Sequence, residues 1–433
     1  MNKCILVILM LCGAQAQGQV VFKSLKEVLL YADDHVYNIK ASVAQQEVDR
    51  SKQVQARSFL YPNVAASSGY TDNLTIQPTL VPTKLFNPNA PDDTYEEMTF
   101  GKEHLYNAGV QAQWDILNFQ KIFAMRTSEM QAEAGRLNIA KVKYNTYNQL
   151  ASTYYSILLM QKTLGIYTDN VEVTAALLKS AKDKYAKGVI SEGDLNRASI
   201  QHLQNLKNRE AAENNLQQLY KQFQSQLNTD QEICATGDLE PHLVENTEFN
   251  TVNPEIRWQE SQVRVSKSVL RQTKALYYPA LSFQYQYNYN WATNDFMHLS
   301  TANKMPSQYL GVKLSIPVFT GFSTKGKVRQ SRSELQIQQM QLDNLRLTKS
   351  LEDETLRLQY QQSDNNLNRT KEILTLQGQN DTYTENKYEA GIISLDERLD
   401  RYNDLLAAQY NYLQSLGDFS LAQYKVYIRQ INY

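Results

Sequence analysis

Aromatic and amide side chains alternate strictly from Leu281 to Trp291. One parity holds Leu, Phe, Tyr, Tyr, Tyr and Trp, and the other holds Ser, Gln, Gln, Asn and Asn. Successive side chains of a strand point to opposite faces, so the pattern predicts a strand with one aromatic and one amide face. Roughly ten alternating residues with aromatics toward one end are typical of a strand that crosses an outer membrane. A half-buried strand of a soluble sandwich has the same alternation, so this stretch alone leaves both open.

Alternation of this kind predicts four strands, at about 62–74, 105–117, 279–291 and 308–319. A membrane barrel needs about eight strands or more, and open edges would be left unpaired in lipid. If the strands are membranous, the chain must therefore pool them with copies of itself, and a trimer would supply twelve. Ile116 shares a parity with Tyr106 and Trp114 in the second strand. The side chains expected to face lipid are Tyr106, Trp114, Phe283, Tyr285, Tyr287, Tyr289 and Trp291.

Long helices are predicted where the chain has no proline. Val328, Leu335 and Leu342 recur every seven residues in a polar background, which favours coiled-coil-like packing. The pattern runs unbroken over about 118–186 and again over about 321–390. Each stretch would span on the order of 100 Å at about 1.5 Å per residue. Helices of this length are not the interior of a compact globule.

Three landmarks occur twice in the same order. SFLYPNV around Pro62 is matched by ALYYPAL, NAGVQAQWDIL by YLGVKLSIPVF, and KYAKGVISEGDL by KYEAGIISLDER. We therefore predict a duplicated unit of helix, two strands, long helix and return helix, over 17–228 and 254–433, joined by a linker at 229–253. The first copy has a longer connection between its strands, rich in Pro, Asn and Asp, which predicts a loop.

Each long helix is followed by a predicted tip turn, at 187–191 and 391–394. Gly188 and Gly391 are placed to end the long helices, because glycine is the usual residue at a helix C-terminus. Ser191 and Ser394 are placed to cap the return helices.

Residues 1–16 read as a secretory signal peptide with a short apolar run and an Ala-Gln-Ala cleavage site. Cys12 leaves lipidation open as a minority interpretation. Cleavage after Ala16 would leave Cys234 as the single cysteine, so no intrachain disulfide is expected. No later apolar run is long enough for a membrane helix, so the mature chain is expected to be soluble outside the cytoplasm or to form an outer-membrane barrel.

The sequence contains no recognisable catalytic or metal-binding motif. The five histidines are scattered without a cysteine cluster, and no HExxH, GxSxG, P-loop or GxGxxG is present. A formal charge of -1 argues against a nucleic-acid partner. We expect no enzyme activity, no cofactor and no metal site.

With these duplicated motifs, the whole mature chain resembles the TolC-like outer membrane factors. The resemblance implies a homotrimer in the outer membrane of a diderm bacterium, extending into the periplasm. Its fold would be mainly α with a membrane β-barrel part, in which a 12-stranded β-barrel continues into a 12-helix periplasmic α-barrel. The residues 229–253 would belong to a belt around the tunnel. The implied partners are a periplasmic adaptor (membrane fusion) protein, an inner-membrane pump of the RND, ABC or MFS type, and outer-membrane lipid.

The resemblance also implies site residues. Asp194, Tyr388, Glu397 and Asp400 match positions of the periplasmic gate, where three-fold symmetry would make carboxylate rings that favour cations. A solvated helix face is the competing interpretation of these carboxylates. Family members carry a basic gate residue where this chain has Ile393, and Arg398 or Arg401 are candidates to replace it. The tip residues expected to contact the adaptor are Gly188, Val189, Ile190, Ser191, Gly391, Ile392, Ile393 and Ser394.

The predicted function is a passive trimeric exit duct of a tripartite efflux or type I secretion system. The alternative is a periplasmic or surface coiled-coil scaffold protein with a soluble sheet. The recurrence of four strands of membrane length favours the duct. The sequence does not identify the cargo, whether drug, metal ion or protein. It also does not show whether the gate is open or closed at rest.

Overall fold

The computed structural model describes residues 20–237, 239, 244, 247–249 and 252–433. The predicted signal peptide at 1–16, including Cys12, and part of the predicted linker at 229–253 lie outside the described residues. The chain forms two compact units. Unit 1 is drawn from Met1–Glu47, Glu133–Ser261 and Gln339–Tyr433, and unit 2 from Val48–Ala132 and Gln262–Gln338.

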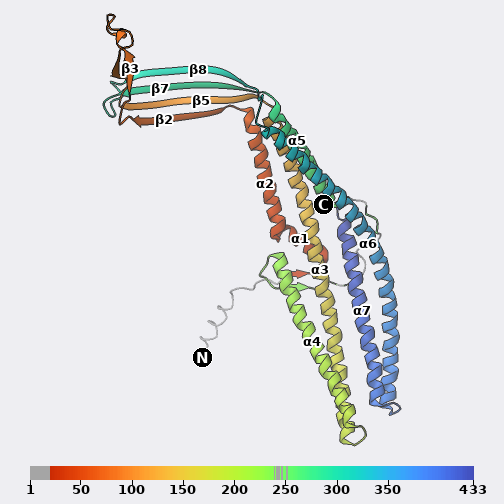
Figure 1. Cartoon of the computed structure of the whole chain (residues 1–433). Helices are drawn as coiled ribbons and strands as arrows, with labels where there is room; N and C mark the ends of the chain where they lie inside the picture. Colours follow the sequence, from red (N-terminus) through yellow and green to blue (C-terminus); the bar gives the residue numbers. More distant parts are fainter. Residues whose placement is uncertain (1–19, 238, 240–243, 245–246, 250–251) are drawn as a thin grey trace, which may run out of the picture. The chain divides into compact units, whose positions relative to one another are not determined.

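Unit 2 contains one four-stranded antiparallel sheet, in the order β2 (Asn63–Asp72), β5 (His104–Asn118), β7 (Ala280–Thr293) and β8 (Asn303–Ser315). Figure 1 shows the four strands side by side. The four predicted strands are thus present, but β8 ends at Ser315 and not at 319. Pro317 explains the early end, because proline has no N–H for the ladder and restricts the residue before it.

The register sorts the side chains of the sheet onto two faces. Tyr106 lies opposite Trp291, Val110 opposite Tyr287, and Trp114 opposite Phe283. The alternate positions bring amides together: Asn107 pairs with Asn290, Gln111 with Gln286 and Gln113 with Gln284. The seven side chains predicted to face lipid therefore share one face of the sheet, which we call the aromatic face, and the opposite side is the amide face.

A β-bulge interrupts the pairing of β5 with β7 between Trp114 and Leu117. One extra residue in β5 shifts the parity of the strand, as bulges do. Leu117, opposite Leu281, therefore continues the aromatic face. Ile116 lies within the bulge, so simple alternation, which takes no account of an inserted residue, does not assign its side chain to a face.

The proline-rich connection between β2 and β5 was predicted as a loop, but it contains a hairpin of β3 (Pro78–Pro82) and β4 (Tyr95–Thr99). This prediction was wrong for a physical reason. Both strands are edge strands of a two-stranded sheet, and Pro78 and Pro82 stand at the ends of β3. Proline is tolerated at such positions.

Four helices contribute one end each to unit 2: α2 (Tyr37–Arg57), α3 (Phe119–Ala186), α5 (Pro254–Lys274) and α6 (Ser323–Glu389). Short 3-10 turns, η1 (Ser58–Leu60) and η3 (Ala275–Tyr277), lead from α2 and α5 toward the strands. Side-chain contacts fix the order of the helices. Arg57 of α2 pairs with Glu129 of α3 at 2.8 Å, and hydroxyl pairs join α3 to α5 (Thr127–Ser268, 2.9 Å) and α5 to α6 (Thr273–Ser331, 3.1 Å). The helices thus follow the order of the strands.

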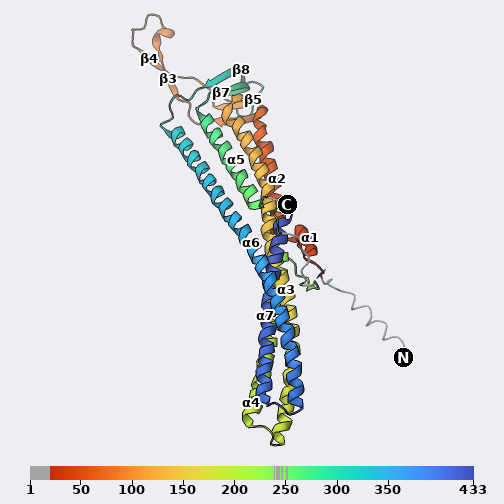
Figure 2. The same ribbon diagram turned by 90° about the vertical axis from the view of Figure 1, so that its right-hand side faces the viewer.

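Unit 1 holds the far ends of α3 and α6, with the return helices α4 (Glu192–Leu227) and α7 (Leu395–Gln430) and the short α1 (Leu25–His35). Figures 1 and 2 show α3 with α4, and α6 with α7, as two hairpins whose turns lie at the same end of this unit. A parallel pair of β1 (Val20–Phe22) and β6 (Ile233–Ala235), which the sequence did not predict, lies beside them. The central core includes Val28, Leu150, Ile157, Phe223, Leu227 and Ile428.

None of the helices in the described part of the chain has both the length and the apolar character that crossing a membrane requires.

Candidate functional site

The aromatic face of the sheet is exposed to the surroundings of the chain. Trp114 is 39% exposed and Tyr287 38%, although large aromatic side chains are normally well buried. Ring pairs run along the face, with centroids 4.9 Å apart for Tyr70 and Tyr106 and 4.6 Å apart for Tyr289 and Trp291. Such a face suits an apolar solvent with a polar boundary, where Tyr and Trp are enriched.

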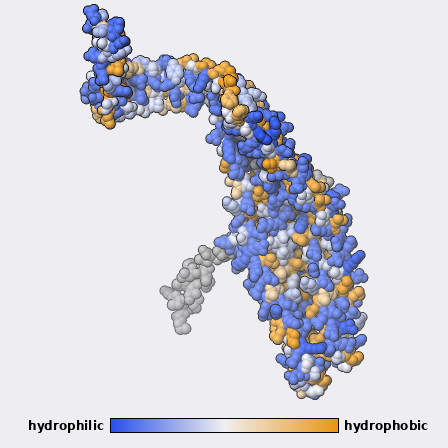
Figure 3. Space-filling model, in the orientation of Figure 1, coloured by the Kyte–Doolittle hydropathy of each residue, from blue (hydrophilic) through white to orange (hydrophobic). Residues whose placement is uncertain are grey.

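Apolar side chains also gather at the end of the sheet that joins the helices, as Figure 3 shows. Here Ile316, Val318, Phe319 and Phe322 are all at least 60% exposed. Large exposed apolar patches mark interaction surfaces or contact with lipid. The junction between strand and helix therefore has the same preference for an apolar environment as the aromatic face.

The amide face is polar and carries few charges. Its glutamines and asparagines donate and accept hydrogen bonds, and Gln286 accepts one from the Tyr309 hydroxyl at 2.5 Å. Gly109 lies on this face opposite Asn288, where an added Cβ would be 2.8 Å from the Tyr287 carbonyl oxygen. The crowding explains a glycine at this point of the strand. A wall of this kind can border water without binding a particular ion.

The two tip turns have matching geometry. Gly188 and Gly391 have φ of +70° and +72°, a left-handed conformation that favours glycine. Each closes its helix in the same way, with N–H groups donating to carbonyls of the last turn, as from Val189 to Lys184 (2.9 Å) and from Ile392 to Lys387 (2.9 Å). Ser191 and Ser394 are the N-caps of α4 and α7. The predicted glycine ends and serine caps are confirmed.

Asp194 takes part in the cap of α4. Its carboxylate accepts hydrogen bonds from the Ser191 hydroxyl (2.8 Å) and backbone N–H (3.0 Å), and its own N–H donates to the Ser191 hydroxyl. These hydrogen bonds hold the pKa of Asp194 below its usual range. Glu397 and Asp400 lie in the first turns of α7 with exposed side chains. The structure therefore leaves two of the predicted gate carboxylates open to solvent and engages the third in a cap.

Tyr388 is buried, with 5% of its surface exposed. Its ring packs in a tip cluster that joins both hairpins and includes Ala181, Ala198, Leu395 and Leu399. The Lys184 ammonium lies 3.6 Å from the ring centroid. In this conformation Tyr388 therefore holds the hairpins together and does not line an open surface, because burial of its ring is favourable. Its place in the gate stays a prediction.

Arg398, one of the two candidates to replace the missing basic gate residue, is 1% exposed. Its guanidinium binds both carboxylate oxygens of Asp381 on α6, the second at 3.3 Å. It is therefore committed to a buried ion pair in this conformation, and its place in the gate stays a prediction. Arg401 is 59% exposed and pairs weakly with Asp404 at 3.6 Å.

A polar network extends from this buried pair and was missed in the sequence. Tyr402, whose ring centroid lies 5.6 Å from the Arg398 guanidinium, donates its hydroxyl to Asn170 of α3 at 3.0 Å. The Asn170 amide donates in turn to Gln409 of α7 at 2.9 Å. A further ion pair, between Arg197 and Asp396, joins α4 to α7. Charged and polar contacts thus connect the two hairpins near their tips.

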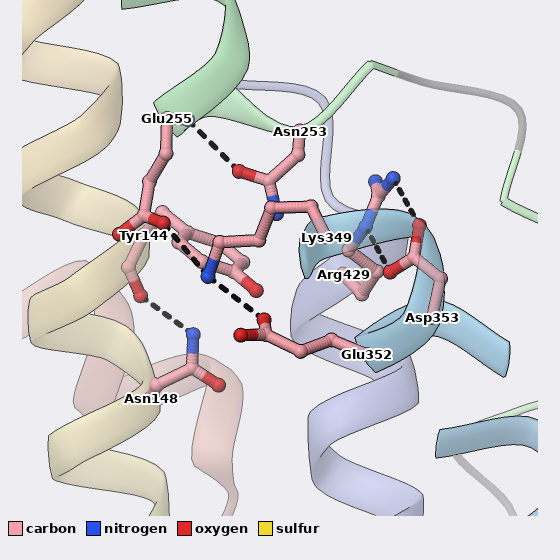
Figure 4. A network of polar contacts seen from close by, with 8 residues as sticks. All are labelled: Tyr144, Asn148, Asn253, Glu255, Lys349, Glu352, Asp353 and Arg429. Atoms are coloured by element: carbon pink, nitrogen blue, oxygen red, sulfur yellow. Dashed lines mark hydrogen bonds and ion pairs between the residues drawn. The ribbon is translucent and has the colours of Figure 1, made fainter. Parts of the chain in front are cut away.

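A second charged network lies where α5, α6 and α7 meet in unit 1 (Figure 4). The Lys349 ammonium lies 2.8 Å from both Glu255 and Glu352, and Arg429 donates two hydrogen bonds to Asp353 at 3.0 and 2.9 Å. Burial lowers the pKa of Lys349, but its hydrogen bonds to the two carboxylates outweigh burial and the pKa lies above its ordinary value. The positions of Lys349 and Asp353 in the sequence did not indicate that they pair with residues of other helices.

Within the described residues, no group of three or more His, Cys, Asp or Glu side chains is arranged to hold a metal ion. Cys234 is a free thiol.

Solved structures of outer-membrane channels share this fold. A membrane protein from Pseudomonas aeruginosa has a TM-score of 0.78 at 12% identity, over 96% of this chain and 91% of that chain. The outer membrane protein VceC of Vibrio cholerae gives 0.70 at 14% identity, over 93% of each chain. The MtrE outer membrane channel of Neisseria gonorrhoeae, in its open state, gives 0.73 at 12% identity, over 94% and 88%. None of the curated proteins searched matches the chain.

The sheet and the long hairpins thus define the fold class of these channels, mainly α with a β-barrel part. The family model of the outer membrane efflux proteins matches residues 36–229 and 250–427. The chain belongs to this family. It is therefore a transport protein of the outer membrane that extends into the periplasm, as the sequence predicted.

Proposed function

We propose that the protein is the passive, trimeric exit duct of a tripartite efflux or type I secretion system. The observation that carries the proposal is the register of the sheet, which places the aromatic side chains on one face and the amides on the other. A closed barrel built from this sheet would turn the aromatic face to lipid and line a water-filled lumen with amides. A soluble sheet, as in the scaffold alternative considered above, would bury its aromatic face in a protein core, whereas Trp114 and Tyr287 are 39% and 38% exposed here.

The edges of the sheet support the trimer. β2 and β8 each pair on one side only, so each leaves a row of backbone N–H and C=O groups unpaired. Lipid offers these groups no hydrogen bonds, so the edges must meet other copies of the chain. Three copies supply twelve strands. On α6, Leu347, Leu351 and Leu358 are 54–63% exposed, which is consistent with a neighbouring copy packing there.

The tips support a partner and a constriction. Val189 is 67% exposed and Ile392 71%, so each turn presents an apolar side chain that suits the periplasmic adaptor. Glu397 and Asp400 project from the start of α7, and three copies would form acidic rings that favour cations. The inner-membrane pump, of the RND, ABC or MFS type, would supply energy and choose the cargo, because the duct itself would be passive.

Conductance tests the proposal. Purified, detergent-extracted protein should produce discrete current steps in a planar bilayer, and chemical cross-linking in the same detergent should give a trimer. Protein that stays in the soluble fraction and never opens a pore would favour the scaffold alternative.

A further inference from the structure

The helical part of unit 2 is strongly cationic. We define the cationic collar as the four helical segments 48–62, 118–132, 262–279 and 320–338, which adjoin the sheet. It contains thirteen Lys or Arg side chains and three acidic ones, Asp49, Glu129 and Glu334, in a chain of formal charge -1. A charge imbalance of this size in one short region creates a positive potential that attracts anions.

Much of this charge has no ion-pair partner among the residues that the structure describes. On α5, Lys267, Arg271 and Lys274 are exposed and form no ion pair with any described residue. Together with Arg264 they are spaced by three or four residues, which places them along one side of the helix. On α6, the exposed side chains Lys325, Lys327, Arg329 and Arg332 likewise form no ion pair with the described residues.

A groove of about 480 Å³ between α3 and α5 concentrates the cations. Its one carboxylate, Glu129, is already paired with Arg57 at 2.8 Å. Two apolar side chains lie beside the cations, so the groove offers both a positive charge and an apolar contact. The groove is lined by Phe123, Arg126, Met130, Arg264, Lys267 and Arg271, with Glu129 and Ser268.

Helical periodicity shows on which side of the sheet the groove lies. Lys121 and Ala124 of α3 line a separate hollow together with Asn63 and Gln113 of the amide face. Side chains turn by about 100° per residue around a helix, so Phe123, Arg126 and Met130 point roughly the opposite way from these two. The groove therefore lies on the side of the aromatic face.

The position of the groove keeps it accessible in the proposed trimer. α3 and α5 are the inner pair of the helix order α2, α3, α5, α6, and they continue the inner strands β5 and β7. Neighbouring copies would meet at the outer strands β2 and β8. The seam between α3 and α5 is thus within one chain and away from the contacts between chains.

The groove also lies at the level of lipid headgroups if the sheet spans the membrane. Arg126 is seven residues past the start of α3, about 10 Å along the helix, and Arg271 is also about 10 Å from the end of η3. The polar headgroup layer on each side of a bilayer is roughly 5–8 Å thick. The cations nearest the sheet therefore fall at or just beyond this layer.

We propose that this groove binds the phosphate group of an anionic phospholipid in the membrane leaflet next to the helices. Arg126, Lys267 and Arg271 hold the phosphate, and Phe123 and Met130 contact the apolar part of the lipid. The inference rests on the proposed function, because it needs the aromatic face to be in lipid.

The test uses the full chain in detergent, incubated with equal amounts of phosphatidylglycerol and phosphatidylcholine and then passed through gel filtration. Mass spectrometry of the retained lipid should show phosphatidylglycerol in excess. In the variant R126Q/K267Q/R271Q this excess should fall about ten-fold or more. Each cation contributes its own binding free energy to the phosphate, so the effects of the three substitutions on affinity multiply. The matched control K182Q/K207Q/K371Q, which removes the same charge from exposed lysines of unit 1, should keep it.

Other results would overturn the proposal. Equal phosphatidylglycerol retention by wild type and the groove variant would remove the groove as the site. Displacement by millimolar inorganic phosphate would assign it to free phosphate, and groove-dependent binding to purified cell-wall sacculi without lipid enrichment would assign it to that polymer. Conductance of the wild-type protein separates the two proposals: a conducting wild-type pore without phosphatidylglycerol enrichment overturns this inference alone, whereas wild-type protein that never conducts overturns the duct.

Discussion

Arg398 on α7 and Asp381 on α6 form a buried bidentate ion pair at positions where the first repeat has Leu195 and Leu178. Both pairs follow the same spacing from the tip glycines, and the two leucines pack against the tip cluster. The second hairpin thus uses charge where the first uses apolar packing. Replacing Asp381 alone by Leu should destabilise the protein by about 3–5 kcal/mol, because the Arg398 charge would be left buried without a partner.

The double variant D381L/R398L tests the cause. It restores the apolar pair of the first hairpin, so its unfolding free energy in guanidinium chloride should return to within about 1–2 kcal/mol of wild type. A double variant as unstable as D381L would show that loss of the ion pair itself, and not the unpaired charge of Arg398, causes most of the destabilisation.

The exposed carboxylates of α7 are expected to set ion selectivity. The variant E397Q/D400N should still form a pore but should lose most of its preference for cations, since the acidic rings would be neutral. Reversal potentials in a salt gradient measure this. The control variant E372Q/E385Q removes two exposed acidic side chains of α6 and should keep the preference for cations. If both variants change the selectivity equally, Glu397 and Asp400 belong to a solvated helix face and not to a constriction.

The tip glycines should resist substitution for conformational reasons alone. No atom of the described residues lies within 4 Å of a Cβ added at Gly188 or Gly391, yet each has a left-handed φ. Alanine at either position should cost about 1–2 kcal/mol, and asparagine less. Thermal unfolding measures the cost. Gly378 is also open around its Cβ but lies inside α6, so G378A should stabilise the protein by about 0.5–1 kcal/mol.

Tyr154 should report on the core of unit 1 at high pH. It is 1% exposed, and its hydroxyl has no hydrogen-bond partner among the described residues. Burial, with smaller contributions from Glu27 and Tyr220, raises the pKa of Tyr154 to about 12. The native state therefore favours the neutral phenol. This stabilisation is complete below the unfolded pKa of about 10 and is lost as the pH rises toward 12.

The variant Y154F should match or exceed wild-type stability at pH 7, because it removes an unsatisfied buried hydroxyl. Between pH 10 and 12 its melting temperature should fall less steeply than that of wild type. Y37F, at a tyrosine that is 68% exposed, should follow wild type throughout. Parallel curves for Y154F and wild type would show that the pKa of this phenol is the same in the native and unfolded states.

The sequence predicted the features that repeat with a regular period. Alternation located the four strands, heptads located α3 and α6, and the paired Tyr-x-x-Gly-x-x-Ser segments located both turns with their caps. These features depend on local conformation and on one buried or lipid-facing side of an element. A period of two or seven residues in the chain records such constraints directly.

Contacts between distant segments could not be predicted in this way. The bulge after Trp114 breaks the period, and the β3–β4 hairpin has proline at both ends of a strand. Arg398 looked like a surface charge because its partner, Asp381, precedes it by 17 residues and lies on the other helix of the hairpin, across the tip turn. A comparison of the two repeats gave the only available signal, since ionic side chains stand there in place of two leucines.

The unpaired edges of the sheet also constrain the order of events in the making of this protein. β2 offers a free edge ten residues long and β8 one of thirteen. A newly exported chain would carry both through the aqueous periplasm, where either can pair with the wrong strand and start aggregation. Biogenesis must therefore either shield these edges until three copies meet or couple insertion to their meeting, so that subunit concentration, and not only sequence, determines the yield of finished channels.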